Sequence, residues 1–88
     1  MANHKSALKR IRQTARRQKR NQHLRSGMRT EIKRFRLAVE AGDASVAGEK
    51  FAAAERAIRR ASSKGLIPAR RADRSVSRLA RSLNALGS

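Results

Sequence analysis

The stretch EAGDAS, residues 40–45, decides the fold because it carries the signals that end one helix and begin the next. Glycine readily adopts the left-handed conformation that often follows a helix, so Gly42 is predicted to end the first helix. An aspartate side chain accepts hydrogen bonds from the free backbone N–H groups at a helix start, so Asp43 is predicted to cap the second helix. The chain is therefore expected to reverse direction here.

One other interior stretch, SSKGLIP at residues 62–68, carries turn signals. Gly65 is predicted to end the second helix, and Leu66 to supply the apolar contact that accompanies such an ending. Pro68 suits the first turn of a third helix, where its missing N–H group costs no hydrogen bond. We therefore expect helices over about residues 6–41, 44–64 and 68–86.

Apolar residues recur at steps of three and four, which is the period of one face of an α-helix, and the alternation typical of a β-strand is missing. The stripes are Met28, Ile32, Phe35 and Val39; Ala47, Phe51, Ala54, Ile58 and Ala61; and Ala69, Ala72, Val76, Leu79, Leu83 and Leu86. Because short turns join three stripes of similar length, we predict an all-α fold, an antiparallel three-helix bundle.

The composition limits the size of the core. The chain has 88 residues, of which 39% are hydrophobic, with two phenylalanines, no tryptophan and no tyrosine. We therefore expect a single domain, residues 1–88, with a thin core of small aliphatic side chains. Cysteine is absent, which excludes disulfides and thiolate metal sites. No apolar run approaches the roughly 20 residues that cross a bilayer.

The net charge of +17 is unevenly distributed. Residues 1–30 hold ten lysines and arginines and no acidic residue, whereas residues 31–60 are nearly balanced. This surplus predicts a polyanionic partner, either nucleic acid or an anionic membrane surface. Arginine outnumbers lysine by 17 to 6, which favours bidentate phosphate contacts. A GC-rich genome explains that ratio equally well, but it does not explain the missing acidic residues.

The first half of helix one does not continue the apolar stripe of its second half. Its own apolar residues, Ala7, Leu8, Ile11 and Ala15, form a narrow strip rotated by roughly a quarter turn. A helix of about 36 residues is roughly 54 Å long, whereas the other two reach only about 30 Å. Residues 1–24 are therefore predicted to project as a basic arm from a bundle of residues 25–88. The cations of this arm are Lys5, Lys9, Arg10, Arg12, Arg16, Arg17, Lys19 and Arg20.

We interpret the arm as a nucleic-acid-binding element and favour RNA over DNA. The sequence has no zinc-ligand spacing, no compact helix-turn-helix and no zipper after a basic region. It also offers no aromatic platform for single-stranded bases. The remaining possibility is that the arm and a basic face of helix three recognise the backbone and shape of a folded RNA. The candidate residues on that face are Arg70, Arg71, Arg74 and Arg78.

Four stretches, at these spacings in a chain of this length, closely resemble one protein family. They are MANHKSALKR at 1–10, RSGMRTEIKRF at 25–35, EAGD at 40–43 and KGLIP at 64–68. Together they resemble the bacterial S20 family of small ribosomal subunit proteins, over nearly the whole chain. Helix three departs from the family pattern through Asp73 and its set of arginines.

This resemblance implies a three-helix bundle with an extended first helix that binds 16S ribosomal RNA directly and supports assembly of the small subunit. It implies a monomer within the particle, located on cytoplasmic ribosomes, without a cofactor or a small-molecule substrate. The residues that it implies as RNA contacts are Lys5, Ser6, Lys9 and Arg10 from the first stretch and Arg25, Arg29 and Lys33 from the second.

Three other classes of function compete with this interpretation. A nucleoid-type DNA-binding protein is the main alternative, and charge alone favours it. A helix lying on a membrane surface has only the narrow strip of Leu8, Ile11 and Ala15 in its support. An enzyme is disfavoured because no carboxylate pair, Cys/His arrangement or phosphate-binding loop occurs.

A few single residues allow sharper expectations. His4 and His23 are too far apart in sequence for a local metal pair, so we expect no metal site and interpret both as polar or phosphate contacts. Gly27, in the middle of a helix, either allows close approach of an RNA backbone or is simply tolerated. Glu55 and Arg59 are predicted to pair four residues apart on one helix.

Overall fold

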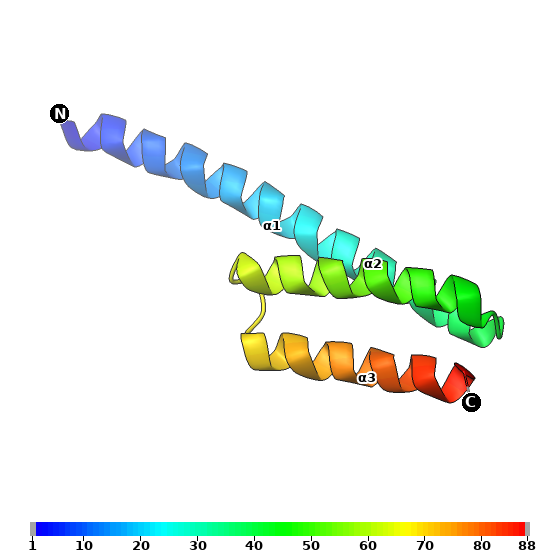
Figure 1. Cartoon of the computed structure of the whole chain (residues 1–88). Helices are drawn as coiled ribbons and strands as arrows, with labels where there is room; N and C mark the ends of the chain where they lie inside the picture. The colour runs from blue at the N-terminus through cyan, green and yellow to red at the C-terminus, as the bar shows by residue number, and fades with distance from the viewer. Residues whose placement is uncertain (1, 88) are drawn as a thin grey trace.

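The computed structural model of the chain describes residues 2–87, and their side chains from His4 onward. Met1 and Ser88, the ends of the predicted domain, lie outside the described residues. Residues 2–87 form three helices and no strand: α1 (Ala2–Glu40), α2 (Ala44–Ser63) and α3 (Ala69–Gly87) (Figure 1). The all-α prediction is confirmed. The main difference from the expected boundaries is that α1 begins at Ala2 rather than near residue 6.

The turn between α1 and α2 forms as the sequence predicts. Gly42 has a φ of +76°, in the left-handed region. Its N–H group donates to the Val39 carbonyl, and the Asp43 N–H group donates to the Ala38 carbonyl, which satisfies the free end of α1. The Asp43 side chain then accepts a hydrogen bond of 3.1 Å from the Val46 N–H group at the start of α2.

The turn between α2 and α3 repeats this arrangement. Gly65 has a φ of +78°, and the Leu66 N–H group donates to the Ala61 carbonyl. Pro68 stands directly before α3 rather than inside its first turn, and its carbonyl accepts the first helical hydrogen bond from Ala72. A proline fits either position because neither requires its N–H group.

The core is small and draws on all three helices. Its buried residues are Phe35 and Ala38 of α1, Ala47, Ala54, Ile58 and Ala61 of α2, and Ala72 and Leu79 of α3. Most of the other stripe residues, including Met28 and Phe51, pack against this cluster while partly exposed. Ala69 is the one exposed residue of the three stripes, and it lies at the first position of α3.

The two phenylalanines occupy the centre of the core. The ring centroids of Phe35 and Phe51 are 5.9 Å apart, and the ring planes meet at 74°, an edge-to-face arrangement that favours aromatic pairs. Phe35 is fully buried, whereas Phe51 is partly exposed. Both aromatic side chains of the chain are thus engaged in packing.

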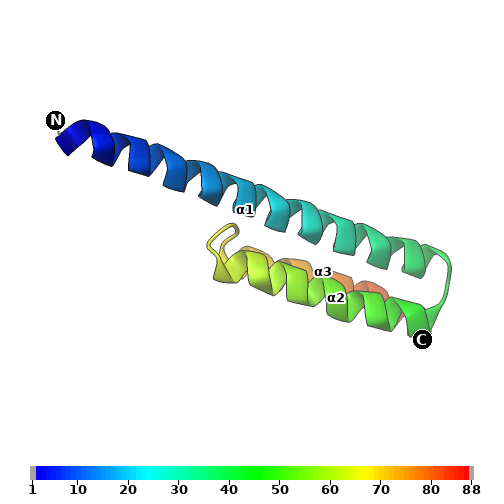
Figure 2. The ribbon, with the colours of Figure 1, turned by 90° about the horizontal axis from the view of Figure 1, so that it is seen from above.

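The helices are arranged with α2 in contact with both others, while α1 and α3 contact each other least. The two short turns make successive helices antiparallel (Figures 1 and 2). The first half of α1 extends well beyond the ends of α2 and α3, past the loop that joins them. The molecule measures 67 × 22 × 13 Å, and its radius of gyration of 17.7 Å exceeds the roughly 12 Å of a compact domain of this length.

No helix within residues 2–87 is long and apolar enough to span a membrane.

Candidate nucleic-acid interface

The first half of α1 has no tertiary neighbours. Every residue from His4 to Arg20 is exposed. This segment is helical because alanine, arginine, lysine and glutamine favour helices, although like charges four residues apart oppose each other. Among the described residues no ion pair or hydrogen bond engages the cationic side chains of this segment. Their charges therefore face solvent unneutralised.

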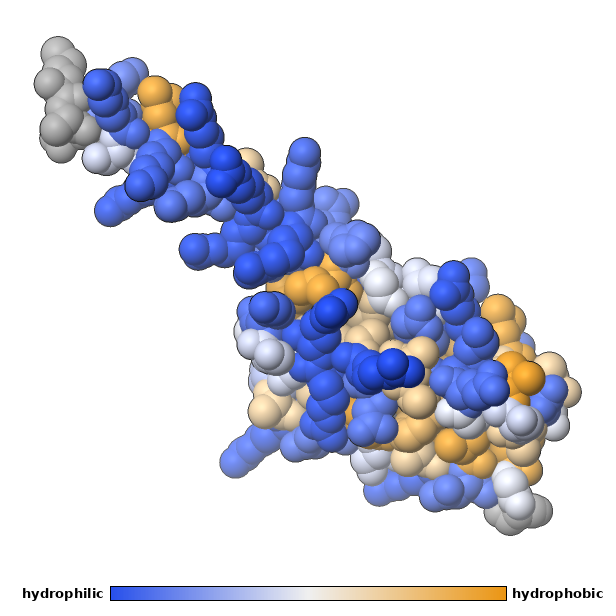
Figure 3. All heavy atoms as spheres, turned by 45° about the horizontal axis from the view of Figure 1, so that its top comes forward, coloured by the Kyte–Doolittle hydropathy of each residue, from blue (hydrophilic) through white to orange (hydrophobic). Residues whose placement is uncertain are grey.

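An apolar patch interrupts this cationic surface. Leu8 is 45% exposed and Ile11 is 64% exposed. Leu8 lines a shallow groove of about 440 Å³ together with Lys5, Lys9, Arg12, Gln13 and Arg16. Figure 3 shows the patch as a small orange area within the blue, hydrophilic surface of α1. The strip that the sequence indicated is thus present and uncovered in the described part of the chain.

The predicted contacts beyond residue 20 fall on two further surfaces. Arg25, Arg29 and Lys33 are exposed along the side of α1 that turns away from α2. Arg70, Arg71, Arg74 and Arg78 are exposed on α3, opposite its buried residues. Because α1 and α3 contact each other least, the structure leaves the α3 arginines as a surface separate from the α1 cations.

The ion pairs differ in part from the sequence prediction. Arg59 donates to the Asp73 carboxylate of α3, so it bridges two helices, and Glu55 acts on it only as a nearby charge. The hydrogen bond to Asp73 is the main cause that raises the Arg59 pKa above its usual value. The predicted pair of Glu55 with Arg59 was wrong because Asp73 offers the guanidinium a direct hydrogen bond. The only other ion pair within residues 2–87 joins Arg34 and Glu31 at 3.2 Å.

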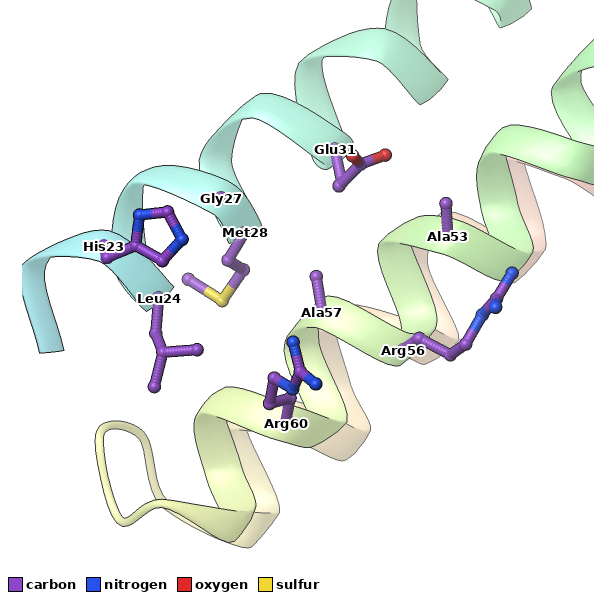
Figure 4. Close-up of a pocket in the computed structure, with 9 residues that line it drawn as sticks. All are labelled: His23, Leu24, Gly27, Met28, Glu31, Ala53, Arg56, Ala57 and Arg60. Atoms are coloured by element: carbon purple, nitrogen blue, oxygen red, sulfur yellow. The ribbon is translucent and has the colours of Figure 1, made fainter. Parts of the chain in front are cut away.

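A cleft of about 600 Å³ separates α1 from α2 where α1 leaves the bundle. Its α1 wall is formed by His23, Leu24, Gly27, Met28 and Glu31. Its α2 wall is formed by Ala53, Arg56, Ala57 and Arg60. Figure 4 shows these side chains on the side of the two helices that faces away from α3.

The cleft combines an apolar floor with a cationic rim. Leu24 and Met28 are partly buried, and Ala57 faces them from α2. Arg56 and Arg60 are exposed at the rim, and the Arg60 guanidinium has no hydrogen-bond or ion-pair partner among the side chains described from His4 onward. Glu31 lies at the opposite end from Arg60 and carries the only carboxylate of the lining.

Sequence reasoning missed this cleft and two of its arginines. Arg56 and Arg60 belong to the charge-balanced middle of the chain, so charge counting gave no reason to single them out. It also missed Asn21, which is half-buried where α1 leaves the bundle and whose side-chain oxygen is buried without a hydrogen-bond partner. The detectable signal is the spacing of Leu24, Met28 and Glu31, which continues the α1 stripe one turn earlier than expected.

The described residues contain no group of three or more histidine, cysteine or acidic side chains placed to hold a metal ion. His4 and His23 are both exposed, and His23 lines the cleft. The structure does not bring these two histidines together.

Comparison with known proteins gives one consistent result. The sequence profile of the family described as ribosomal protein S20 matches residues 2–84. Small ribosomal subunit protein bS20 of Geotalea daltonii is 58% identical over 86 residues, which cover 98% of this chain and 99% of that protein. The bS20 protein of Geotalea uraniireducens is 55% identical over 99% of this chain and 100% of its own length. The bS20 protein of Desulfovibrio desulfuricans is 43% identical over 98% of this chain and 97% of its own length.

Proposed function

Because the chain belongs to the ribosomal protein S20 family, we propose that it is a structural component of the bacterial small ribosomal subunit that binds 16S ribosomal RNA directly and supports subunit assembly. In this role it recognises the phosphate backbone and shape of the RNA rather than reading its sequence. It acts as a monomer within the particle, on cytoplasmic ribosomes, and it is not an enzyme.

One observation carries this proposal: a helix projects beyond the bundle with its cations exposed and unpaired from Lys5 to Arg20. Unpaired cations on a rod without protein neighbours release counterions when they meet phosphates, and this release drives binding. We assign residues 1–24 to an RNA-binding arm and residues 25–88 to a bundle that orients it.

The proposed RNA contacts divide into three groups. The arm supplies Lys5, Ser6, Lys9, Arg10, Arg12, Arg16, Arg17, Lys19 and Arg20. The outward side of α1 beyond the arm supplies Arg25, Arg29 and Lys33, and α3 supplies Arg70, Arg71, Arg74 and Arg78. All of these residues are exposed, which direct phosphate contact requires. The separation of the α3 group from the α1 groups supports contact with more than one RNA helix.

A competition experiment tests the proposal against its main alternative, a nucleoid-type DNA-binding protein. A labelled transcript of the folded 5′ domain of 16S ribosomal RNA is bound at fixed salt and challenged with unlabelled RNA or random duplex DNA. We expect the RNA to displace the label at a concentration at least tenfold lower than the DNA, since specific binding exceeds non-specific binding by roughly a thousandfold or more for well-studied nucleic-acid-binding proteins. Equal displacement would overturn the proposal.

A further inference from the structure

The cleft between α1 and α2 is open although its walls consist of residues that allow helices to pack closely. Gly27 on one wall and Ala53 and Ala57 on the other are small. A Cβ atom built on Gly27 would meet no atom within 4 Å, so its lack of a side chain does not serve contact between the helices. Glycine also costs a helix interior about 0.5–1 kcal/mol relative to alanine. This position therefore keeps space open at a cost to the helix.

The cleft lies on the same side of α1 as a row of cations on the arm. Lys5, Lys9, Arg12, Arg16 and Arg20 follow one another at steps of four, three, four and four residues. His23 and Gly27 continue the row with steps of three and four, which keeps all of these positions on one face of a helix. An RNA strand whose phosphates contact this row of cations would reach the open side of the cleft.

The chemistry of the cleft matches a nucleotide rather than a bare phosphate. Its volume of about 600 Å³ falls within the roughly 300–1,000 Å³ typical of small-molecule sites. Leu24, Met28 and Ala57 offer an apolar surface to a base, and Arg60 offers an unpaired guanidinium to its phosphate. Because Phe35 and Phe51 are engaged with each other in the core, neither is available as a platform for stacking bases. The face of the base must therefore lie on the apolar side chains of the cleft.

We propose that this cleft binds one unstacked nucleotide of the RNA, with its base between Met28 and Ala57 and its phosphate on Arg60. The Glu31 carboxylate lies at the far end and is paired with Arg34 through one oxygen. Its other oxygen sets the orientation because it accepts a hydrogen bond from a base N–H group. This assignment rests on the proposed function and adds to it a site that reads an RNA loop or bulge, where bases are unstacked.

A steric test compares two alanines of α2. Ala57→Leu fills the cleft, whereas Ala52→Leu adds the same side chain at an exposed position outside the lining. With the 5′-domain transcript, Ala57→Leu is expected to weaken binding roughly tenfold, because the added side chain occupies the space of the base. Its slope of log affinity against log salt should fall by at most the roughly 0.7–0.9 of one phosphate, and Ala52→Leu should bind like the wild-type chain. If circular dichroism shows that Ala57→Leu is unfolded, Gly27→Leu fills the same cleft from α1 instead.

A charge test compares two neighbouring arginines. Arg60→Gln should lower the slope of log affinity against log salt by roughly 0.7–0.9, because one phosphate is no longer neutralised. Arg59→Gln is the matched control because Arg59 faces Asp73 of α3 and lies outside the lining of the cleft, so its slope should match the wild type.

Ultraviolet crosslinking locates the occupant. After tryptic digestion, a nucleotide is expected on the peptide of residues 26–29, which carries Gly27 and Met28, and this product should fall at least severalfold in Ala57→Leu. Wild-type affinity in Ala57→Leu, or crosslinking of these residues to a protein in reconstituted subunits, would overturn the assignment. Failure of the wild-type chain to prefer the RNA over duplex DNA would instead remove the proposed function, so the two failures are distinguishable.

Discussion

Gly42 and Gly65 show how single residues set the topology of this chain. Both lie in the left-handed region, at φ values of +76° and +78°, and each directs the hydrogen bonds that close a helix. A side chain at either position strains the backbone because its Cβ atom approaches the following carbonyl oxygen. Gly48 differs from both, since it lies within α2 and outside the left-handed region. A Cβ atom there would meet nothing within 4 Å.

Alanine substitutions at Gly42 and Gly48 should therefore change the free energy of unfolding in opposite directions. Gly42→Ala should lower the free energy of unfolding by about 1–2 kcal/mol through left-handed strain. Gly48→Ala should raise it by about 0.5–1 kcal/mol because alanine favours the helix interior. Urea unfolding followed by circular dichroism measures both changes. If both variants shifted in the same direction, the assignment of Gly42 to a strained turn would be wrong.

Leu79 is the residue on which the bundle depends most in α3. It is 7% exposed and belongs to the cluster of Phe35 and Ile58. A buried Leu→Ala substitution typically costs about 2–5 kcal/mol, and ordinary domains have only about 5–15 kcal/mol in total. We expect Leu79→Ala to be substantially unfolded at 37 °C and to regain helicity when RNA is added, because binding to the native form stabilises it.

Circular dichroism with and without the RNA transcript measures this effect, and Arg78→Ala serves as the surface control from the same turn. An unfolded Arg78→Ala beside a folded Leu79→Ala would mean that the buried face of α3 had been assigned to the wrong side.

At the scale of the elements, α1 performs two tasks with two halves. Its second half packs through Phe35 and Ala38, both buried, while every residue from His4 to Arg20 in its first half is exposed. Contacts with the rest of the molecule begin near Asn21 and Leu24, both half-buried. Substitutions in the first half should therefore change binding without changing the stability of the bundle.

Replacing Arg12, Arg16 and Lys19 with glutamine tests this separation. Glutamine has a similar helix propensity but is shorter and carries no charge. RNA affinity should fall, and its salt dependence should flatten by roughly 0.7–0.9 for each phosphate that the variant no longer neutralises. The melting temperature of the variant should stay within a few degrees of the wild type, because these side chains touch no neighbouring helix. A large drop in melting temperature with an unchanged salt slope would identify them as structural instead.

For the molecule as a whole, the sequence predicted what depends on local rules. The two turns followed from Gly42, Asp43 and Gly65, and the helical spacing predicted the buried Ala54, Ile58 and Leu79. Capping signals and helical periodicity do not indicate which helices contact each other.

Apart from the start of α1 at Ala2, the misses arise between helices. The pairing of Arg59 with Asp73 requires the spacing of α2 and α3, and the cleft requires the path along which α1 leaves α2. The exposure of Ala69 depends on where α3 begins relative to its neighbours. Neither the charge distribution nor the helical periodicity of the sequence predicts the distances between side chains on different helices.

The elongated dimensions of 67 × 22 × 13 Å also affect the hydrodynamic behaviour of the free chain. A rod experiences more friction than a sphere of equal mass, because it presents a larger surface to the solvent. The free chain, at 9.8 kDa, should therefore elute from a gel-filtration column ahead of globular standards of its mass. Early elution would follow from its length alone, so light scattering is the measurement that separates an elongated monomer from a dimer.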